Sequence, residues 1–409
     1  MIAPEYHIRD CVEADMDLIR YLFSVEGFSD LQSPENVRVA VTPDNTMYGA
    51  CRLEQGSDGS WNVRPIVVFD VVQGKGVGRA LLNDALRLHP DLRLVARGEI
   101  EPFYLSCGFE RCGWDAIAPE YRAECDACPD KAACGPLPFR SLPIERTFTF
   151  LGTSSGCGVP AFFCHCPACE AARKDPSKRR GCTGVALRGH GTTVIDAPPD
   201  VRHQLNREGI SVINDFFLTH AHYDHMGGLG EFEYFIRLYL MGTMPFHASE
   251  YAIAETLKEY SYMDDCFVLD VMDEYDTREV DGLTIQALPL KHAPGTFGYL
   301  ITTPQGRRTF YAPDTSDLKP EVIEILKGVD NLVMDSTFWE NHGTARSHHD
   351  VRQTVHEGID ILDAGRVYLT HLAPHMCEPG VNEIDEIYRY AEQFDGRVIV
   401  AEDGMQFTL

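Results

Sequence analysis

Positive charge is scarce in this sequence, which has 36 lysines and arginines against 62 aspartates and glutamates and a formal net charge of −26. Proteins that hold DNA or RNA cluster Lys and Arg against the phosphate backbone. The charge balance therefore argues against general nucleic-acid binding. It leaves open a small anionic substrate in a locally positive or metal-filled pocket.

Long apolar runs are also missing. No stretch is apolar enough to span a bilayer, and the start of the chain shows no basic segment followed by an apolar one, as an export signal would. We therefore expect a cytoplasmic protein with no membrane partner. In a reducing compartment, the fourteen cysteines favour free thiols and metal sites over disulfides.

Histidine is distributed unevenly along the 409 residues, because fourteen of the sixteen histidines lie beyond residue 160. The chain is long enough for two or three domains, so this asymmetry indicates that its two ends carry out different chemistry. The proline-rich run from Gly135 to Pro143 is the best candidate for a linker. We accordingly predict one domain over residues 1–140 and another over 141–409.

The densest group of potential metal ligands lies in Thr219–His225, which reads T-H-x-H-x-D-H. It follows a short apolar run that predicts a buried strand, and it is followed by Met226 and then by two glycines. In an extended chain His220 and His222 lie on the same side, and once the chain coils Asp224 and His225 can face a second point. Imidazole and carboxylate groups are ligands of borderline divalent metals. The stretch therefore predicts a metal site at a strand-to-helix corner.

Other predicted strands in the C-terminal part also end at or beside a potential ligand. The residues at these ends are Asp196, His292, Asp314, Asp335 and His371. One such ending is chance, whereas repetition indicates that the ends of several strands converge on one site.

Two groups of cysteines have the spacing of metal ligands. Cys164, Cys166 and Cys169 form a C-x-C-x2-C loop, which predicts a structural zinc site with one distant fourth ligand. Cys125, Cys128 and Cys134 also include a C-x2-C pair. For this second group, which needs a fourth ligand, free thiols are an equal alternative.

A glycine-rich turn in the N-terminal part follows a predicted strand and opens an apolar helix. It consists of Gln73, Gly74, Lys75, Gly76, Val77, Gly78 and Arg79. Such a turn offers backbone N–H groups and a helix N-terminus to a phosphate, although a plain tight turn is the alternative. A second motif, Phe103-Tyr104-x3-Gly108-Phe109, follows about 30 residues later.

Together these two motifs resemble the GNAT N-acetyltransferases. The resemblance covers about 110 residues and implies a GNAT fold, a mixed sheet with flanking helices, whose glycine turn binds acetyl-CoA. It also implies that Tyr104 acts as general acid toward the CoA thiolate, with a core aromatic as the alternative role. Glu99 and Glu101 are candidates for a general base, and each could equally be a solvated loop carboxylate. The acetyl acceptor is not indicated.

The order of elements over residues 147–409 resembles the metallo-β-lactamase superfamily, an αββα sandwich of two sheets. The resemblance implies that one divalent metal, manganese or zinc, binds His220, His222 and His292. It implies that a second binds Asp224, His225 and His371, and that Asp314 bridges both.

A finer resemblance is to the phosphoribosyl cyclic phosphodiesterases of the carbon–phosphorus lyase pathway. It rests on the Cys164–Cys169 loop, on Thr-Phe-Gly-Tyr-Leu at 296–300 and on Leu-Thr-His at 369–371. It implies that His375 completes the structural zinc site, although the spacing from His371 is one residue longer than in that family. It also implies that His348 is an acid or a phosphate-binding group, with its neighbour His349 as the alternative.

The sequence thus predicts a bifunctional protein of phosphonate metabolism. Its hydrolase would convert a small cyclic phosphodiester, similar to 5-phosphoribosyl 1,2-cyclic phosphate, into a phosphomonoester, with Asp224 and His348 as catalytic residues. The expected partners are a small phosphorylated substrate and acetyl-CoA, and a homodimer is compatible with the sequence. One alternative is a ribonuclease Z-like endonuclease, because Leu-Gly-Thr-Ser-Ser-Gly at 151–156 is shared with that type. Another makes acetyl transfer or acetyl-CoA sensing the main activity.

Overall fold

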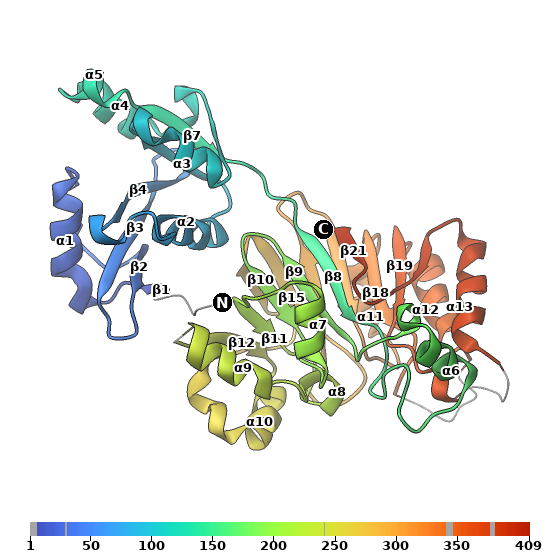
Figure 1. Cartoon of the computed structure of the whole chain (residues 1–409). Helices are drawn as coiled ribbons and strands as arrows, with labels where there is room; N and C mark the ends of the chain where they lie inside the picture. Colours follow the sequence, from blue (N-terminus) through green and yellow to red (C-terminus); the bar gives the residue numbers. More distant parts are fainter. Residues whose placement is uncertain (1–5, 29–30, 241, 341–346, 377–380) are drawn as a thin grey trace. The chain divides into compact units, whose positions relative to one another are not determined.

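The computed structural model describes residues 6–28, 31–240, 242–340, 347–376 and 381–409. The chain forms two compact units, one made mainly by the residues up to Ile144 and the other mainly by those from Glu145 onward (Figure 1). Within the described ranges, none of the helices combines the length and the apolar character needed to cross a membrane.

The N-terminal unit is built on one seven-stranded mixed sheet with the order β1-β2-β3-β4-β5-β7-β6. Its strands are β1 (His7–Asp10), β2 (Val37–Val41), β3 (Met47–Gln55), β4 (Trp61–Val68), β5 (Leu92–Ala96), β6 (Phe109–Arg111) and β7 (Leu137–Ser141). Its helices are α1 (Met16–Val25), α2 (Val77–Leu88), α3 (Glu101–Ser106), α4 (Pro119–Ala127) and α5 (Lys131–Cys134).

Helices α1 and α2 pack on opposite faces of this sheet. Ile19 of α1 shares a buried cluster with Val39 of β2, whereas Leu81 of α2 shares another cluster with the next residue of β2, Ala40. Successive side chains of a strand point to opposite faces, so the two clusters lie on the two sides of the sheet. The N-terminal unit is therefore a sheet covered by helices on both faces.

The linker prediction for the proline-rich run is wrong, because β7 lies inside it. Strand β7 pairs antiparallel with both β5 and β6, and its Phe139 is fully buried in the core. Proline at position 138 did not prevent the strand, because a proline removes only the N–H of its own residue from the ladder.

The C-terminal unit contains two seven-stranded sheets, with the orders β13-β12-β11-β10-β9-β8-β21 and β14-β15-β16-β17-β18-β19-β20. The strands of the first are β8 (Thr147–Gly152), β9 (Gly184–Arg188), β10 (Thr192–Ile195), β11 (Asp215–Phe217), β12 (Met244–Ala248), β13 (Phe267–Val271) and β21 (Gln406–Thr408). Those of the second are β14 (Thr277–Val280), β15 (Leu283–Pro289), β16 (Phe297–Thr302), β17 (Arg308–Ala312), β18 (Asn331–Asp335), β19 (Arg366–Thr370) and β20 (Val398–Val400).

Two apolar cores define the layers of this unit. One core joins the sheets face to face and includes Phe148 and Phe217 of the first sheet and Tyr299 and Tyr311 of the second. The other lies between the second sheet and its helices. The helices of the unit are α6 (Pro167–Lys174), α7 (Val201–Arg207), α8 (Tyr223–Met226), α9 (Gly230–Tyr234), α10 (Glu250–Glu259), α11 (Pro320–Leu326), α12 (Val351–His356) and α13 (Glu383–Ala391). In Figure 1, α7, α9 and α10 lie on the side of the first sheet and α12 and α13 on the side of the second.

Parallel pairing brings the ends of several strands to the same edge of each sheet. Strands β10, β11 and β12 run parallel in the first sheet, and β17, β18, β19 and β20 run parallel in the second. Their carboxyl ends therefore meet at one edge, and the loops that leave this edge carry the candidate ligands. This is why residues up to about 175 positions apart in the sequence can share a site.

Candidate dinuclear metal centre

Three imidazoles, those of His220, His222 and His292, converge on one point. Together with Asp314 they form a group that we call the His220 half-site. His222 Nδ1 lies 2.9 Å from His220 Nε2 and 3.1 Å from His292 Nε2. Nitrogens bound about 2.0–2.1 Å from a single ion are spaced by about 3 Å, so this geometry fits coordination. Burial lowers the pKa of all three imidazoles, which keeps them in the neutral form that binds metals.

A second group, which we call the His371 half-site, consists of Asp224, His225 and His371. Asp224 Oδ2 lies 3.6 Å from His225 Nε2 and 3.5 Å from His371 Nε2. His225 comes from the first turn after β11, and His371 directly follows β19 of the other sheet. The half-site therefore forms only when the two sheets are packed together.

Asp314 lies between the half-sites and presents one oxygen to each. Its Oδ2 is 3.3 Å from His292 Nε2 and 3.7 Å from His220 Nε2, whereas its Oδ1 is 3.2 Å from His225 Nε2 and 3.3 Å from His371 Nε2. Burial opposes ionisation of Asp314, but the surrounding imidazoles lower its pKa well below the usual value. An ionised carboxylate in this position can bridge two cations.

The residues present fit a pair of divalent cations. In the described part of the chain, His225 Nε2, His371 Nε2 and Asp314 Oδ1 are buried without a hydrogen bond of good geometry. Buried polar atoms of this kind are costly unless a partner satisfies them. Burial also opposes a charge on His225, yet the carboxylates of Asp314, Asp224 and Asp196 raise its pKa well above the usual value. The site therefore favours positive charge at the point between these three buried atoms.

Asp196 orients a histidine of each half-site. Its Oδ2 lies 2.9 Å from His225 Nδ1, and its Oδ1 accepts from the N–H (2.8 Å) and the hydroxyl (2.9 Å) of Thr219. Because the Thr219 hydroxyl donates to Asp196, its oxygen is available to accept from His220 Nδ1 at 3.1 Å. In both histidines Nε2 is thereby left free for a ligand. Asp196 has a positive φ of 68°, a strained conformation that often accompanies functional sites.

Asp335 makes the same arrangement from the second sheet. Its Oδ1 accepts from the N–H (3.0 Å) and hydroxyl (2.6 Å) of Thr337, and the Thr337 oxygen lies 2.9 Å from His371 Nδ1. Its Oδ2 lies 2.8 Å from His348 Nδ1. Burial lowers the pKa of His348, but Asp335 and the neighbouring carboxylates outweigh it and raise that pKa to about 9. His348 also falls within a ligand-sized group with Asp314 and His371.

Sequence reasoning noticed Asp196 and Asp335 only as acids at strand ends and assigned them no role. A threonine near each could have distinguished them from the ligands. Thr219 follows the next strand after Asp196, and Thr337 lies two residues after Asp335. His349, the alternative to His348, is fully buried with its Nε2 3.6 Å from Glu357. It is His348, not His349, that the structure brings to the metal-type residues.

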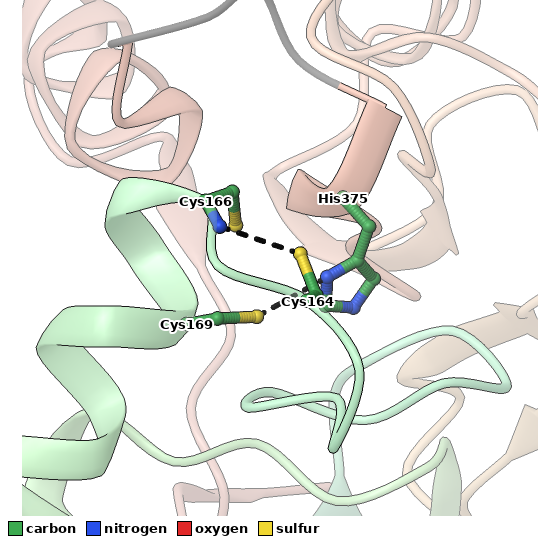
Figure 2. Close-up of side chains that lie close together, drawn as sticks. All are labelled: Cys164, Cys166, Cys169 and His375. Carbon is green, nitrogen blue, oxygen red and sulfur yellow. Dashed lines mark hydrogen bonds between the residues drawn. The ribbon is translucent and has the colours of Figure 1, made fainter.

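The loop that carries Cys164, Cys166 and Cys169 lies at the start of α6, and His375 approaches it from a distant part of the chain (Figure 2). Cys164, Cys166, Cys169 and His375 offer four ligand atoms within 4.8 Å of one another. His375 Nδ1 is 3.2 Å from Cys169 Sγ, and its Nε2 donates to the carbonyl of Gly158 (2.7 Å). Three thiols and one imidazole suit tetrahedral zinc. The groups of close ligand atoms among the described residues do not include Cys125, Cys128 and Cys134.

The glycine-rich turn predicted to bind a cofactor lies between β4 and α2. Its residues Gln73–Gly76 are exposed, and Gly76 is the N-cap of α2 with a φ of 87°. Val77 is buried in the core, so only its backbone N–H is available to a ligand. Among the described residues, no side chain caps the helix.

Two polar side chains of this turn have partners within the protein. Gln73 Nε2 donates to Val68 O (3.2 Å) and Asp70 Oδ1 (2.9 Å). Arg79 donates to the carbonyl (2.5 Å) and hydroxyl (2.9 Å) of Ser106. These two side chains therefore shape the turn.

Tyr104, the predicted general acid, is 5% exposed and packs in the core of the N-terminal unit. Its ring centroid lies 5.6 Å from that of Phe139 and 6.0 Å from that of Phe109. Burial raises the pKa of Tyr104 above its usual value, so its hydroxyl stays protonated. The core role, one of the two alternatives from the sequence, is visible directly in these contacts.

The comparisons with known proteins concern the C-terminal unit. The family model of the beta-lactamase superfamily domain matches residues 192–372. The crystal structure of a diphosphatase from the PhnP family is 25% identical and superposes with a TM-score of 0.55, covering 65% of this chain and 97% of that chain. The C-terminal unit is a metallo-β-lactamase sandwich. Domains of this fold typically bind divalent metals, in agreement with the two groups of ligands at its sheet edge.

Two curated relatives that match this chain have other names. The coenzyme PQQ synthesis protein B of Cupriavidus necator is 25% identical over 303 residues, which are 63% of this chain and 98% of that protein. An octanoyltransferase of Porphyromonas gingivalis is 25% identical over 245 residues, which are 55% of this chain. The chain spans 46% of the length of that octanoyltransferase. Because the matching proteins have such different names, the similarity does not specify the substrate.

Proposed function

We propose that the C-terminal unit is a dinuclear-metal phosphodiesterase that hydrolyses a small cyclic phosphodiester, similar to 5-phosphoribosyl 1,2-cyclic phosphate, to a phosphomonoester. The observation that carries this proposal is the position of Asp314 between two groups of three ligands. Two adjacent cations suit in-line displacement at phosphorus, because they stabilise the attacking and the leaving oxygens together. The similarity to a PhnP-family diphosphatase supports chemistry at phosphorus.

The protein's own residues supply the remaining functions. His220, His222 and His292 would hold one cation, Asp224, His225 and His371 the other, and Asp314 both. When bound, the cations supply Lewis acidity that activates water and offsets the negative charge of phosphoryl oxygens.

His348 is the proposed proton donor to the departing oxygen. Asp335 binds its Nδ1 and holds the imidazole in one orientation, so Nε2 is the nitrogen that can reach a substrate. A pKa raised to about 9 keeps the ring protonated near neutral pH. The Asp335–His348 pair thereby provides an acid whose position does not depend on the substrate.

The substrate is tested with purified protein loaded with Mn²⁺ or Zn²⁺. Four compounds are compared: a ribose 1,2-cyclic phosphate, a 2′,3′-cyclic nucleotide, a nucleoside diphosphate and a precursor tRNA. We expect the ribose cyclic phosphate to have the highest kcat/KM. Cleavage of the precursor tRNA alone would show a ribonuclease Z-like enzyme instead, and cleavage of the diphosphate alone would show a diphosphatase.

A second activity is proposed for the N-terminal unit, namely the binding of acetyl-CoA as in a GNAT N-acetyltransferase. Strands β4 and β5 run parallel but, in the described structure, pair only through Trp61 with Leu92 and Asn62 with Arg93. The later residues of β4 thus leave backbone groups on that side for an extended ligand, and β4 leads toward the N-terminus of α2. Such a terminus attracts a pyrophosphate.

Acetyl-CoA binding is tested by calorimetry on the whole chain and on Gly76→Asp. The substitution strains a left-handed position (φ 87°) and adds a negative charge at the helix N-terminus, so we expect binding to be lost. Gly59→Asp is the matched control, because Gly59 is also left-handed (φ 82°) with no atom within 4 Å of an added Cβ. If the two variants bind acetyl-CoA equally well, the glycine turn is not the binding site.

A further inference from the structure

A short turn, Ser155–Gly158, connects the cysteine cluster to the metal centre. The turn is closed by a hydrogen bond from the N–H of Gly158 to the carbonyl of Ser155 (3.0 Å). At one end, the Gly158 carbonyl accepts the hydrogen bond from Nε2 of His375, whose Nδ1 belongs to the cluster. The position of this carbonyl therefore depends on how the cluster holds His375.

The other part of the turn lies against Asp224. A Cβ added to Gly156 would lie 2.9 Å from Asp224 Oδ2 and 3.0 Å from its Cγ, so the backbone of Gly156 forms the wall behind this carboxylate. Glycine is required there because any side chain would displace the carboxylate or the turn. The turn thus limits where one ligand of the His371 half-site can lie.

The same segment also holds the backbone beside His371. The N–H of Ser155 and the hydroxyl of Ser154 both donate to the carbonyl of Leu372, at 3.1 and 3.0 Å. His371 itself has a positive φ of 59°, a strained conformation that persists only where surrounding contacts impose it. Residues 154–156 therefore support two of the three ligands of this half-site.

The His220 half-site has different supports. His220 is oriented by Thr219, and His292 Nδ1 donates to the carbonyl of Ser347 (2.8 Å). Neither of these partners belongs to the turn or to the cluster. A change in the cluster consequently reaches the His371 half-site through this turn, and it reaches the His220 half-site through residues that contact both, such as Asp314 and His225.

We infer that the cluster of Cys164, Cys166, Cys169 and His375 sets the metal affinity of the His371 half-site selectively, through the Ser155–Gly158 turn. This inference rests on the proposed pair of metals. His375 is then a positioning residue for the active site as well as a ligand of the cluster. Because coupling between two sites is reciprocal, a metal in the His371 half-site also strengthens metal binding in the cluster.

The test measures Co²⁺ binding rather than turnover. Each half-site is isolated by removing a ligand of the other, with His222→Ala leaving the His371 half-site and His371→Ala leaving the His220 half-site. Co²⁺ is titrated into each protein, and thiolate-to-cobalt absorption reports the cluster separately from the bands of the histidine sites. Because no substrate is involved, an incorrect substrate assignment leaves this measurement unaffected.

Two substitutions break the connection at different points. His375→Cys keeps four ligands in the cluster but removes the donor to Gly158. Gly156→Ala keeps the cluster and that hydrogen bond but places a methyl group against Asp224. Cys157→Ser is the matched control, because Cys157 lies in the same turn with an exposed side chain.

We expect both substitutions to weaken Co²⁺ binding in the His371 half-site by about 10–100-fold, the usual loss when a group that supports a ligand is removed. The His220 half-site should change by less than about 3-fold, and Cys157→Ser should change neither. Equal losses in both half-sites, or unchanged affinity of the His371 half-site in Gly156→Ala, would overturn the inference. If His375→Cys loses the thiolate absorption because the cluster does not form, the inference still requires a selective loss in the His371 half-site, and unchanged affinity there overturns it.

Discussion

Asp196 and Asp335 occupy equivalent positions at the ends of β10 and β18, in opposite sheets of the C-terminal unit. Each accepts two hydrogen bonds from a threonine, Thr219 or Thr337, whose hydroxyl oxygen faces a histidine. Each also contacts a second histidine directly, at 2.9 Å for His225 and 2.8 Å for His348. The two sheets thus support the site with the same arrangement of a carboxylate, a threonine and two histidines.

The difference between the two lies in what their histidines do. Both histidines held by Asp196 are candidate metal ligands, one in each half-site. Of those held by Asp335, His371 is a candidate ligand, whereas His348 is the proposed acid. The first sheet is therefore expected to contribute mainly metal retention, and the second sheet to contribute both metal retention and proton transfer. Four predictions test this division, beginning with the one expected to have the largest effect.

Asp314→Ala removes the carboxylate that both half-sites share. We expect hydrolysis to fall to the uncatalysed rate and the active-site metal content to fall from two equivalents, because each cation loses a ligand and the charge that stabilised it. Activity assays and metal analysis of the purified protein measure both effects. Asp317→Ala is the control, because Asp317 is a largely exposed carboxylate three residues away. Retained hydrolysis in Asp314→Ala would refute the ligand assignment.

His348→Gln separates proton transfer from metal retention. We expect kcat to fall by about 10²–10⁴-fold, as when a general acid is removed, while two metal equivalents remain. The measurement pairs steady-state kinetics with metal analysis on one preparation. Loss of a metal equivalent would instead identify His348 as a ligand, and the two carboxylates would then have the same role.

Asp196→Asn and Asp335→Asn compare the carboxylates directly. In each variant an amide replaces a charged acceptor, so the histidine that it contacts loses its orientation. We expect Asp196→Asn to lower Zn²⁺ affinity by about 10–100-fold. Asp335→Asn should affect kcat more strongly than affinity, because one of its histidines binds no metal. Equal effects on affinity and equal effects on kcat in the two variants would contradict the division.

Thr219→Val and Thr337→Val have the smallest expected effects. Valine has nearly the shape of threonine but no hydroxyl, so His220 or His371 loses the acceptor for its Nδ1 while its direct ligand position remains. We expect each variant to lower Zn²⁺ affinity several-fold, consistent with a loss of about 1 kcal/mol for one hydrogen bond. Competition with a chelating dye in single half-site variants measures the change. A larger loss of affinity in the His371 half-site than in the His220 half-site of Thr219→Val would show that the hydroxyl acts by positioning Asp196 rather than by contacting His220.

Much of the fold of the C-terminal unit could be predicted from local patterns. The strands predicted to end at or beside Asp196, Asp314, Asp335 and His371 correspond to β10, β17, β18 and β19. These are short apolar runs buried on both faces, a pattern that is typical of buried strands. The run from Gly135 to Pro143 was wrongly predicted to be a linker. Its prolines favour a linker locally, whereas the burial of Phe139 in the core stabilises β7.

The site was less predictable in its supports than in its ligands. Histidines and carboxylates at strand ends are visible in a sequence because few other roles need them there. The threonine that follows each carboxylate is a weak signal, but the hydrogen bonds of Asp196 to His225 and of Asp335 to His348 join separate segments of the chain, so no spacing reveals them. For the N-terminal unit, the acetyl-CoA site and the role of Tyr104 stay predictions.

By itself, the sequence determined the kinds of ligand available and the chemistry that they suit: imidazoles and carboxylates for divalent cations, and a C-x-C-x2-C loop for zinc. Only the tertiary structure decided which of them meet. His375 reaches Cys169, and Gly156 reaches Asp224, because the packing of two sheets and their loops brings residues from distant positions within contact distance. Residue type determines the chemistry of a site, whereas the coupling between sites depends on backbone contacts that have no signature in residue type.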